Sequence, residues 1–262
     1  MCRLFAYVAA GSSTVKRELG DDGVEKLTSL ARLHGDGWGW AGISQTGAAP
    51  TTVKSPKSAL KDPQFNEMLS QPSHAAMIHL RWATMGLPVE MCNAHPFSTG
   101  ELSFEHNGSL KPIAKVREML SAESRAKMTG VTDSEMYFML IQEEIGHGLT
   151  LPEAVIKAVR RLRSAFPLSS LNAILLDSQQ LVVVHASARS TLPEADVEEF
   201  KELGGLPDEH NEDYFALRMK RTRDDTILIS STGVDGSGWE NLPPESVTTI
   251  DLDSRAMHTD FL

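Results

Sequence analysis

The chain has 262 residues, of which 41% are hydrophobic and 23% charged, a composition typical of a globular protein. Its net charge of −10 disfavours non-specific nucleic-acid binding, because phosphate groups attract a basic surface. Two cysteines, Cys2 and Cys92, cannot build a disulfide framework, and no apolar run reaches the roughly 18 residues of a membrane span, so we expect a cytoplasmic protein with neither nucleic acid nor membrane as partner.

The N-terminus carries the first candidate functional residue. Met1-Cys2-Arg3 precedes an apolar run of seven residues, Leu4 to Ala10, which is too short for the core of a signal peptide. The run instead predicts a strand over 3–9. Because Met before a small residue is normally trimmed, we expect the mature chain to begin with Cys2.

The hydrophobic pattern predicts the later elements in chain order. We expect a helix over 22–34, strands over 38–44, 50–55 and 75–83, and a hairpin over 95–98 and 101–105 with Gly100 at its turn. Helices follow at about 109–121, 133–146 and 152–165. Strands are expected over 171–176, 181–186, 214–222, 226–231 and 246–252, and the polar segment 193–213 is left unassigned. This order favours helices packed outside stacked, mainly antiparallel sheets, in a single domain over 2–262.

Polar residues gather beside three predicted strand ends, in the segments His79-Leu80-Arg81-Trp82-Ala83-Thr84, Asn93-Ala94-His95-Pro96-Phe97 and His106-Asn107-Gly108. With Cys2 at the start and Thr132-Asp133-Ser134-Glu135 opening a helix, they resemble the glutaminase domain of the class II glutamine amidotransferases. Those enzymes are N-terminal-nucleophile (Ntn) hydrolases. The segment His34-Gly35-Asp36-Gly37-Trp38-Gly39 is similar to their stand-alone YafJ-like or EgtC-like branch, and Met85, where many class II enzymes have His, favours that branch. The resemblance is strong over 2–140 and holds only in pattern from 171 onward.

The resemblance implies an α+β fold, a four-layer αββα sandwich with two stacked antiparallel sheets. It also implies an amidohydrolase that cleaves the γ-amide of glutamine or of a γ-glutamyl amide through a thioester on Cys2, without a cofactor. A thiol has an ordinary pKa of about 8.5 and an α-amine one of about 7.7–8.0, so part of the amine is neutral at pH 7. The α-amine of Cys2 could therefore take the proton of its own thiol.

The same resemblance gives roles to the other residues. Asn107, through its side-chain amide, and Gly108, through its backbone N–H, would stabilise the oxyanion. As an alternative, Asn-Gly is also the strongest short-range signal of a hairpin turn. The expected substrate-binding residues are Arg81, Trp82, Thr84, His106 and Asp133.

Arg81 would bind the substrate α-carboxylate with two parallel hydrogen bonds, and Asp133 would bind the α-ammonium group. Each role has an alternative: Arg81 could form a surface ion pair, and Asp133 could belong to a helix capped by a Thr132–Glu135 capping box. Trp82 and Thr84 would line the pocket. His106 is also expected to serve for packing.

The sequence predicts no metal site, because the nine histidines include no HExxH or HxH pair and there is no CxxC. The glycines Gly35, Gly37 and Gly39 lack the helix start of a phosphate loop and predict close backbone approach beside Cys2. Three functions remain open for the chain. It could be a complete γ-glutamyl hydrolase, a glutaminase subunit whose synthase partner is a separate chain, or a non-catalytic γ-glutamyl sensor.

Overall fold

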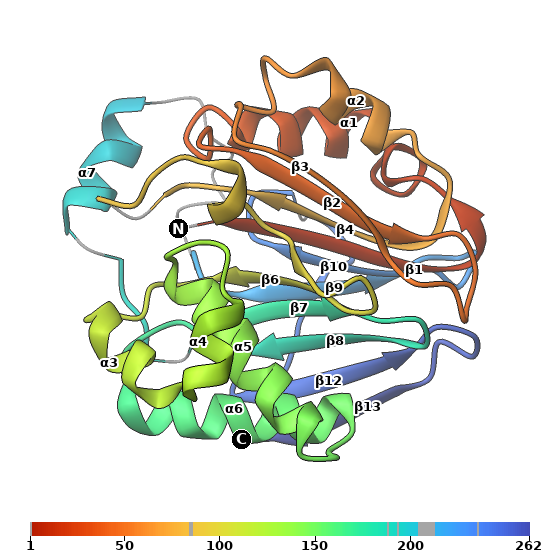
Figure 1. Ribbon diagram of the computed structural model, residues 1–262. Helices are drawn as coiled ribbons and strands as arrows, with labels where there is room; N and C mark the ends of the chain where they lie inside the picture. Colours follow the sequence, from red (N-terminus) through yellow and green to blue (C-terminus); the bar gives the residue numbers. More distant parts are fainter. Residues whose placement is uncertain (1, 84–85, 188, 193, 204–212, 235) are drawn as a thin grey trace.

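A computed structural model describes residues 2–83, 86–187, 189–192, 194–203, 213–234 and 236–262. Two sheets are stacked face to face, and helices cover the outer face of each (Figure 1). Every strand pairing among the described residues is antiparallel. The expected α+β class and its αββα layering are therefore confirmed.

The first sheet has seven strands in the order β11-β9-β10-β1-β4-β2-β3, and the second has six in the order β13-β12-β8-β7-β6-β5. The first sheet contains β1 (Arg3–Ser13), β2 (Trp38–Ile43), β3 (Thr51–Ser55), β4 (Ser73–Leu80), β9 (Leu217–Arg221), β10 (Ile227–Ser231) and β11 (Glu240–Asn241). The second contains β5 (Phe97–Ser98), β6 (Ser103–Asn107), β7 (Asn172–Leu176), β8 (Gln180–His185), β12 (Ser246–Asp251) and β13 (Met257–Phe261). β1 is thus a central strand, and both its neighbours come from distant parts of the chain.

Helices pack on the outer faces of both sheets. On the first sheet lie α1 (Val15–Leu30) and α2 (Pro63–Leu69), and on the second α5 (Asp133–Gly146) and α6 (Leu151–Ala165), with α3 (Ile113–Met119) and α4 (Ala122–Lys127) beside α5. A 3-10 turn, η1, covers Met91–Asn93, and α7 covers Glu194–Leu203. None of the described helices is both long and apolar enough to cross a membrane.

The alternation of side chains along β1 connects the layers. Leu4 and Ala6 point into the core between the two sheets, whereas Phe5 and Tyr7 pack beneath α1 and α2. By the same period of two, Cys2 falls on the inter-sheet face. The nucleophile candidate therefore lies at one end of the inter-sheet layer.

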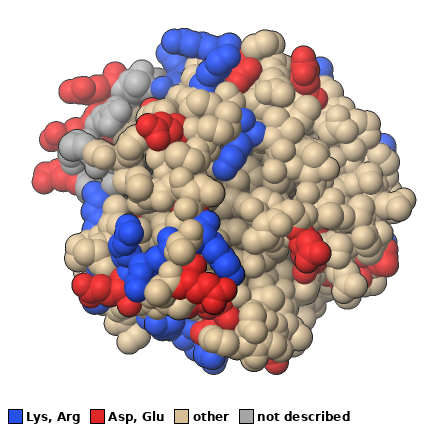
Figure 2. Space-filling model, in the orientation of Figure 1, with Lys and Arg blue, Asp and Glu red and all other residues tan. Residues whose placement is uncertain are grey.

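The surface over α3 to α6 carries Lys and Arg next to Asp and Glu (Figure 2). Close pairs there include Lys157–Glu144 at 2.6 Å and Lys127–Glu123 at 2.8 Å. This face thus has no uniform field of one sign.

Several predicted boundaries are wrong. The first helix starts at Val15, not at residue 22, because the side chain of Thr14 caps it and it absorbs a non-helical Gly20. The helix expected over 109–121 is shorter, because α3 covers only Ile113–Met119, and α4, which Ser121 caps, lies beyond the predicted range. The prediction missed α2 and β13 altogether, although Asp62 before Pro63 is a helix-start signal. Within the unassigned segment 193–213, α7 appears, and residues 193 and 204–212 lie outside the described residues.

Gly39 is required by a close approach of main chain, which comes from the His95–Pro96 segment. Gly39 lies in β2, opposite His79 of β4, and a Cβ there would overlap the carbonyl oxygen of His95 and the ring of Pro96. The glycine therefore lets the His95–Pro96 segment rest against the sheet main chain. Gly37 is needed for another reason, its φ of 131°.

We predict that Gly39→Ala lowers the free energy of unfolding by about 1–3 kcal/mol, because the added methyl group must push the His95 carbonyl away. Urea denaturation monitored by circular dichroism measures this change. Gly11→Ala in β1 is the matched control, since a Cβ there meets nothing within 4 Å. Equal midpoints for the two variants would contradict the close approach at Gly39.

Candidate functional site

Cys2 is joined to the opposite sheet by its own backbone. Its side chain is buried, and its nitrogen donates a 2.8 Å hydrogen bond to Oδ1 of Asn107. Asn107 is the last residue of β6 in the second sheet, and Cys2 directly precedes β1 of the first sheet. The bond therefore connects the two sheets at the residue that carries the thiol. The sequence motif therefore brings together residues that are 105 positions apart.

The side-chain nitrogen Nδ2 is the second polar group of Asn107. Its Nδ2 is buried and has no hydrogen-bond partner among the described residues. An unpaired buried donor is costly, so such a group is expected to meet an acceptor when a ligand binds. The alternative of an Asn107–Gly108 hairpin turn is wrong, because neither residue has the positive φ that a type I′ turn needs.

Ser170 braces the loop that follows β6. Its hydroxyl donates to the carbonyl of Asn107 at 2.7 Å, and its carbonyl accepts from Nε2 of His106 at 3.2 Å. A Cβ at Gly108 would overlap that same carbonyl oxygen, so only glycine fits there. Ser170 thus contacts all three residues of the His106-Asn107-Gly108 segment.

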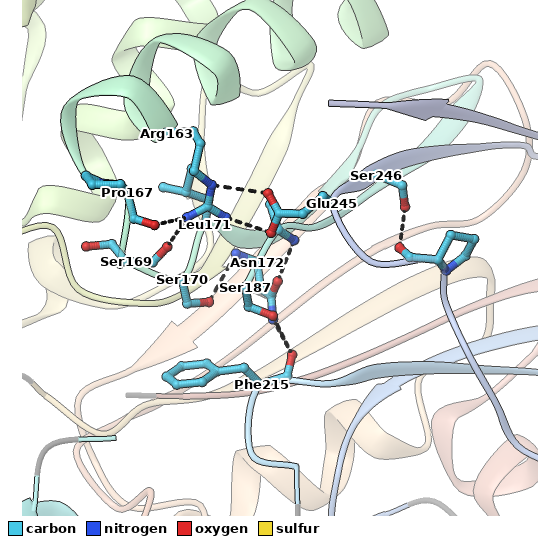
Figure 3. Close-up of polar contacts among 12 residues, drawn as sticks. Arg163, Pro167, Ser169, Ser170, Leu171, Asn172, Ser187, Phe215, Glu245 and Ser246 are labelled. Carbon is cyan, nitrogen blue, oxygen red and sulfur yellow. Dashed lines mark hydrogen bonds and ion pairs between the residues drawn. The ribbon is translucent and has the colours of Figure 1, made fainter. Parts of the chain in front are cut away.

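The segment of Ser170 is itself held from the helix layer. Arg163 of α6 donates to the carbonyl of Ser169 at 2.7 Å and forms an ion pair with Glu245 at 3.0 Å (Figure 3). Both side chains are largely shielded from solvent, with 19% and 34% of their surface exposed. The brace behind the loop is therefore an ordered network that the sequence motifs did not indicate.

His106 points away from Asn107, into the helix layer. Its Nδ1 accepts from the hydroxyl of Ser134 at 2.9 Å, a tautomer assigned because Nε2 faces the carbonyl of Ser170. The ring packs edge-to-face on Tyr137, and burial lowers the pKa of His106, with the carboxylate of Asp133 opposing that shift. This agrees with the packing role expected of His106, whereas its contact with substrate stays a prediction.

Arg81 is buried beside the site, and no carboxylate in the described part of the chain pairs with it. Only 3% of its surface is exposed, so the surface ion pair considered as an alternative is wrong. Its guanidinium donates to the carbonyls of Pro88 at 3.3 Å and Asp36 at 3.5 Å, and it pairs with no carboxylate of the described residues. A buried guanidinium with only long bonds to neutral carbonyls is suited to bind an external carboxylate.

Asp133 opens α5 and touches the loop after Gly108. The side chain is buried, and its Oδ2 accepts the backbone N–H of Leu110 at 2.6 Å. A carboxylate therefore stands at the loop that carries the expected oxyanion donors. Its predicted contact with a substrate ammonium group stays a prediction.

Only one of the two hydrogen bonds of the predicted capping box forms at the start of α5. Thr132 caps α5, since its hydroxyl accepts the N–H of Glu135 at 3.1 Å. The carboxylate of Glu135 instead accepts the N–H groups of Thr129 at 2.7 Å and Gly130 at 2.8 Å. Glu135 thus orders the preceding loop, and the capping box as predicted is wrong.

Trp82 packs against an aromatic cluster formed by distant segments. Its ring lies edge-on to His34, with 5.9 Å between centroids, and beside the buried Tyr214 and Phe215. Thr84, the other expected pocket residue, and Met85 lie outside the described residues.

Two further histidines are buried here without charge. His79 of β4 stacks on His95 at 4.0 Å between centroids, and its Nε2 donates to the carbonyl of His106 at 3.3 Å. Burial lowers the pKa of His79 to about 3 and that of His95 well below its ordinary value. Among the residues described, no group of three or more His, Cys, Asp or Glu is placed to hold a metal ion.

Glu105 is the residue at this end that sequence reasoning missed. It lies two positions before Asn107 on β6 and hence on the same, inter-sheet face. It is fully buried, and neither carboxyl oxygen has a hydrogen-bond partner in the described part of the chain. Burial, helped by the nearby Cys2, raises the pKa of Glu105 well above its ordinary value. The predicted strand ended at residue 105, and extending its period of two to Asn107 was the available signal.

We predict that Glu105→Gln stabilises the protein increasingly as the pH rises above 4.5, the ordinary pKa of glutamate. Above that pH, Glu105 ionises in the unfolded chain but keeps its proton in the folded one, so the parent protein loses stability and the Gln variant does not. The expected difference grows by up to about 1.4 kcal/mol per pH unit until the folded-state carboxyl ionises.

Urea denaturation at pH 4, 5.5 and 7 measures this difference. Glu118→Gln, which removes an exposed carboxylate from α3, serves as the control. Parallel stability curves for Glu105→Gln and the parent protein would show that Glu105 is not a protonated buried group.

Comparison with known proteins gives an independent result. A sequence model of the glutamine amidotransferases class-II family matches residues 1–248. The glutamine–fructose-6-phosphate aminotransferase (isomerizing) of Gluconobacter oxydans is 33% identical over 146 residues, which cover 55% of this chain and 24% of that protein. The protein of the same name from Leifsonia xyli subsp. xyli is 31% identical over 198 residues, covering 73% of this chain and 30% of that protein. The chain thus spans under a third of the length of these curated relatives.

Solved structures show the same fold. A glutamine aminotransferase class-II domain protein from Silicibacter pomeroyi superimposes with a TM-score of 0.65 at 18% identity, covering 99% of both chains. The glutamine phosphoribosylpyrophosphate amidotransferase of B. subtilis gives a TM-score of 0.65 at 15% identity, covering 99% of this chain and 49% of that one. At such identities the likeness shows the fold alone, which is the αββα sandwich of the Ntn amidotransferases.

Proposed function

Because the chain belongs to the class II glutamine amidotransferases, we propose that it hydrolyses the γ-amide of glutamine or of a γ-glutamyl amide through a thioester on Cys2. One observation carries this proposal. Asn107 accepts a hydrogen bond from the nitrogen of Cys2, and Nδ2 of the same side chain is buried without a hydrogen-bond partner among the residues that the structure describes. One residue thus fixes the nucleophile and keeps a donor for the oxyanion.

The nucleophile and its base belong to one residue in this proposal. Once Cys2 is N-terminal, its α-amine takes the position that donates to Oδ1 of Asn107, and the remaining lone pair can accept the thiol proton. The histidines nearby are poor bases for this step, because burial holds His79 and His95 in the neutral form with strongly lowered pKa values.

The reaction then proceeds in two steps. The Cys2 sulfur bonds to the amide carbon, the oxyanion accepts hydrogen bonds from Nδ2 of Asn107 and the N–H of Gly108, and the proton moves through the α-amine to the leaving nitrogen. The carbon–nitrogen bond breaks, releasing ammonia or an amine and leaving the thioester. Water attacks the thioester carbon, its proton returns to the sulfur, and glutamate leaves.

Two charged residues would select the glutamyl group. Arg81 supplies a buried guanidinium without a carboxylate partner among the described residues, and Asp133 supplies a carboxylate at the loop after Gly108. A cation and an anion that face the same ligand would fit the α-carboxylate and α-ammonium groups shared by glutamine and all γ-glutamyl amides. Neither Arg81 nor Asp133 would distinguish one leaving amine from another.

A second candidate is a glutaminase that delivers ammonia to a synthase on another chain. It is favoured by the curated relatives, in which the matched region makes up 24–30% of a longer protein. Glutamate release from L-glutamine and from bulky γ-glutamyl amides separates the candidates. Fast release from a bulky amide supports a self-contained hydrolase, whereas feeble release from glutamine alone supports the synthase-coupled form. No release with the fold intact would favour a γ-glutamyl sensor.

We predict that Cys2→Ala abolishes glutamate release while glutamine still binds, because only the sulfur is removed and Arg81 remains in place. Enzymatic glutamate detection measures turnover, and calorimetry measures binding. Cys92→Ala is the matched control, since Cys92 is the other free cysteine and lies only partly buried in η1. Turnover by Cys2→Ala at the parental rate would exclude Cys2 as nucleophile.

We predict that Arg81→Lys raises the KM for glutamine about ten- to a hundred-fold, the effect of losing a bidentate charged hydrogen bond. Steady-state kinetics measures this change, with kcat expected to fall less. Arg125→Lys of α4 is the control, because Arg125 also donates to two main-chain carbonyls. If the KM of Arg81→Lys stays within two-fold of the parent, Arg81 does not bind the α-carboxylate.

A further inference from the structure

We propose that Arg3, the residue after the nucleophile, is a positioning residue that holds Cys2 in its reactive orientation from the carbonyl side. This inference rests on the proposed function for the role of Cys2 as nucleophile. It brings residues 214–232, which lie outside the strong sequence resemblance, into the construction of the site.

The side chain of Arg3 is buried, with 1% of its surface exposed, and each of its three nitrogens donates to at least one oxygen atom. Nε donates to the carbonyl of Cys2 at 2.8 Å. Nη1 donates to the carbonyl of Thr232 at 3.0 Å and to its hydroxyl at 3.2 Å, and Nη2 donates to the carbonyl of Tyr214 at 3.1 Å. Each nitrogen of the planar fork thus has an acceptor in a different segment, which one ammonium group could not reproduce.

The ring of Tyr214 packs against the guanidinium of Arg3. The guanidinium carbon lies 3.7 Å from the ring centroid of Tyr214, within cation–π distance. The next residue, Phe215, is tied to the second sheet, because its carbonyl accepts from Nδ2 of Asn172 at 2.6 Å and from the hydroxyl of Ser187 at 3.2 Å (Figure 3). Arg3 therefore rests on a segment that is anchored to the opposite sheet.

Cys2 is in consequence held at both ends of its backbone. Asn107 accepts from its nitrogen, and Arg3 donates to its carbonyl, each at 2.8 Å. Leu4, two residues after Cys2, is fixed too, since its N–H donates to the hydroxyl of Ser231 at 3.1 Å. A residue before the first strand would otherwise rotate about its backbone, and a misplacement of about 1 Å can cost a hundred-fold in rate.

The charge of Arg3 favours the same role. It forms no ion pair with any carboxylate of the described residues, and its partners among them are neutral carbonyls, the hydroxyl of Thr232 and an aromatic ring. A buried cation held by neutral groups retains an attraction for negative charge nearby. Both the thiolate and the oxyanion of the proposed reaction are anions at Cys2.

Arg3→Lys tests the inference because it keeps the charge and removes the fork. We expect kcat to fall about a hundred-fold, with KM within three-fold of the parent, since Arg81 and Asp133 are untouched. We also expect slower alkylation of Cys2 by iodoacetamide across pH 6–9, measured by peptide mass spectrometry on protein shown by intact mass to begin with Cys2. Cys92 in the same sample is the internal reference for thiol reactivity.

Two more variants keep the test decisive. Arg255→Lys is the matched control, because Arg255 also donates to a carbonyl and is largely buried but lies at the far end of the sheets, beside Asp225. Tyr214→Leu removes the ring beneath Arg3 and keeps the Tyr214 carbonyl, so it should change Cys2 alkylation and kcat in the same direction by less. Tyr214→Leu becomes the test of the positioning role if Arg3→Lys does not fold.

The two readouts separate the possible failures. The positioning role would be overturned if Arg3→Lys only lowered the melting temperature. In that case the rate of Cys2 alkylation and the kcat per folded molecule would both stay within two-fold of the parent. A parent protein without turnover would instead contradict the proposed function. The alkylation comparison would still decide whether Arg3 orients Cys2.

Discussion

The hydrogen bond from the Cys2 nitrogen to Oδ1 of Asn107 is the constraint on which the site depends. It requires that the start of β1 and the end of β6 meet across the inter-sheet layer, and hence that the two sheets stack in one register. At Gly39 and Gly108, near this end of the sheets, main chains meet without intervening side chains. The brace by Ser170 then fixes the other end of the bond.

Burial decides which groups near Cys2 carry charge. His79, His95 and Glu105 are all driven to their neutral forms, because an ion in this layer would lose its hydration without a partner. The arginines behave differently, since a guanidinium stays protonated and satisfies itself with carbonyl oxygens. The described side chains around Cys2 thus offer fixed hydrogen-bond donors but no histidine with a pKa near neutrality that could serve as a base. Such surroundings suit a nucleophile whose own α-amine is the base.

The fold was predictable where local signals were strong. The apolar run of β1 and the apolar spacing of α6 predicted a strand and an amphipathic helix, and Gly100 with φ of 91° forms the expected turn between β5 and β6. Local signals failed where tertiary contacts override them. The edge strand β13 has a mostly polar sequence and is stabilised by pairing with β12.

The sequence by itself determined the family and the identity of the candidate residues, because chemistry restricts which side chains can serve at Cys2, Arg81 and Asn107. Only the tertiary structure decided what surrounds them. Ser170 meets Asn107, and Tyr214 meets Arg3, across 63 and 211 positions of chain. Such contacts depend on the stacking and pairing of strands, which no local periodicity encodes, and they convert a set of motif residues into an oriented site.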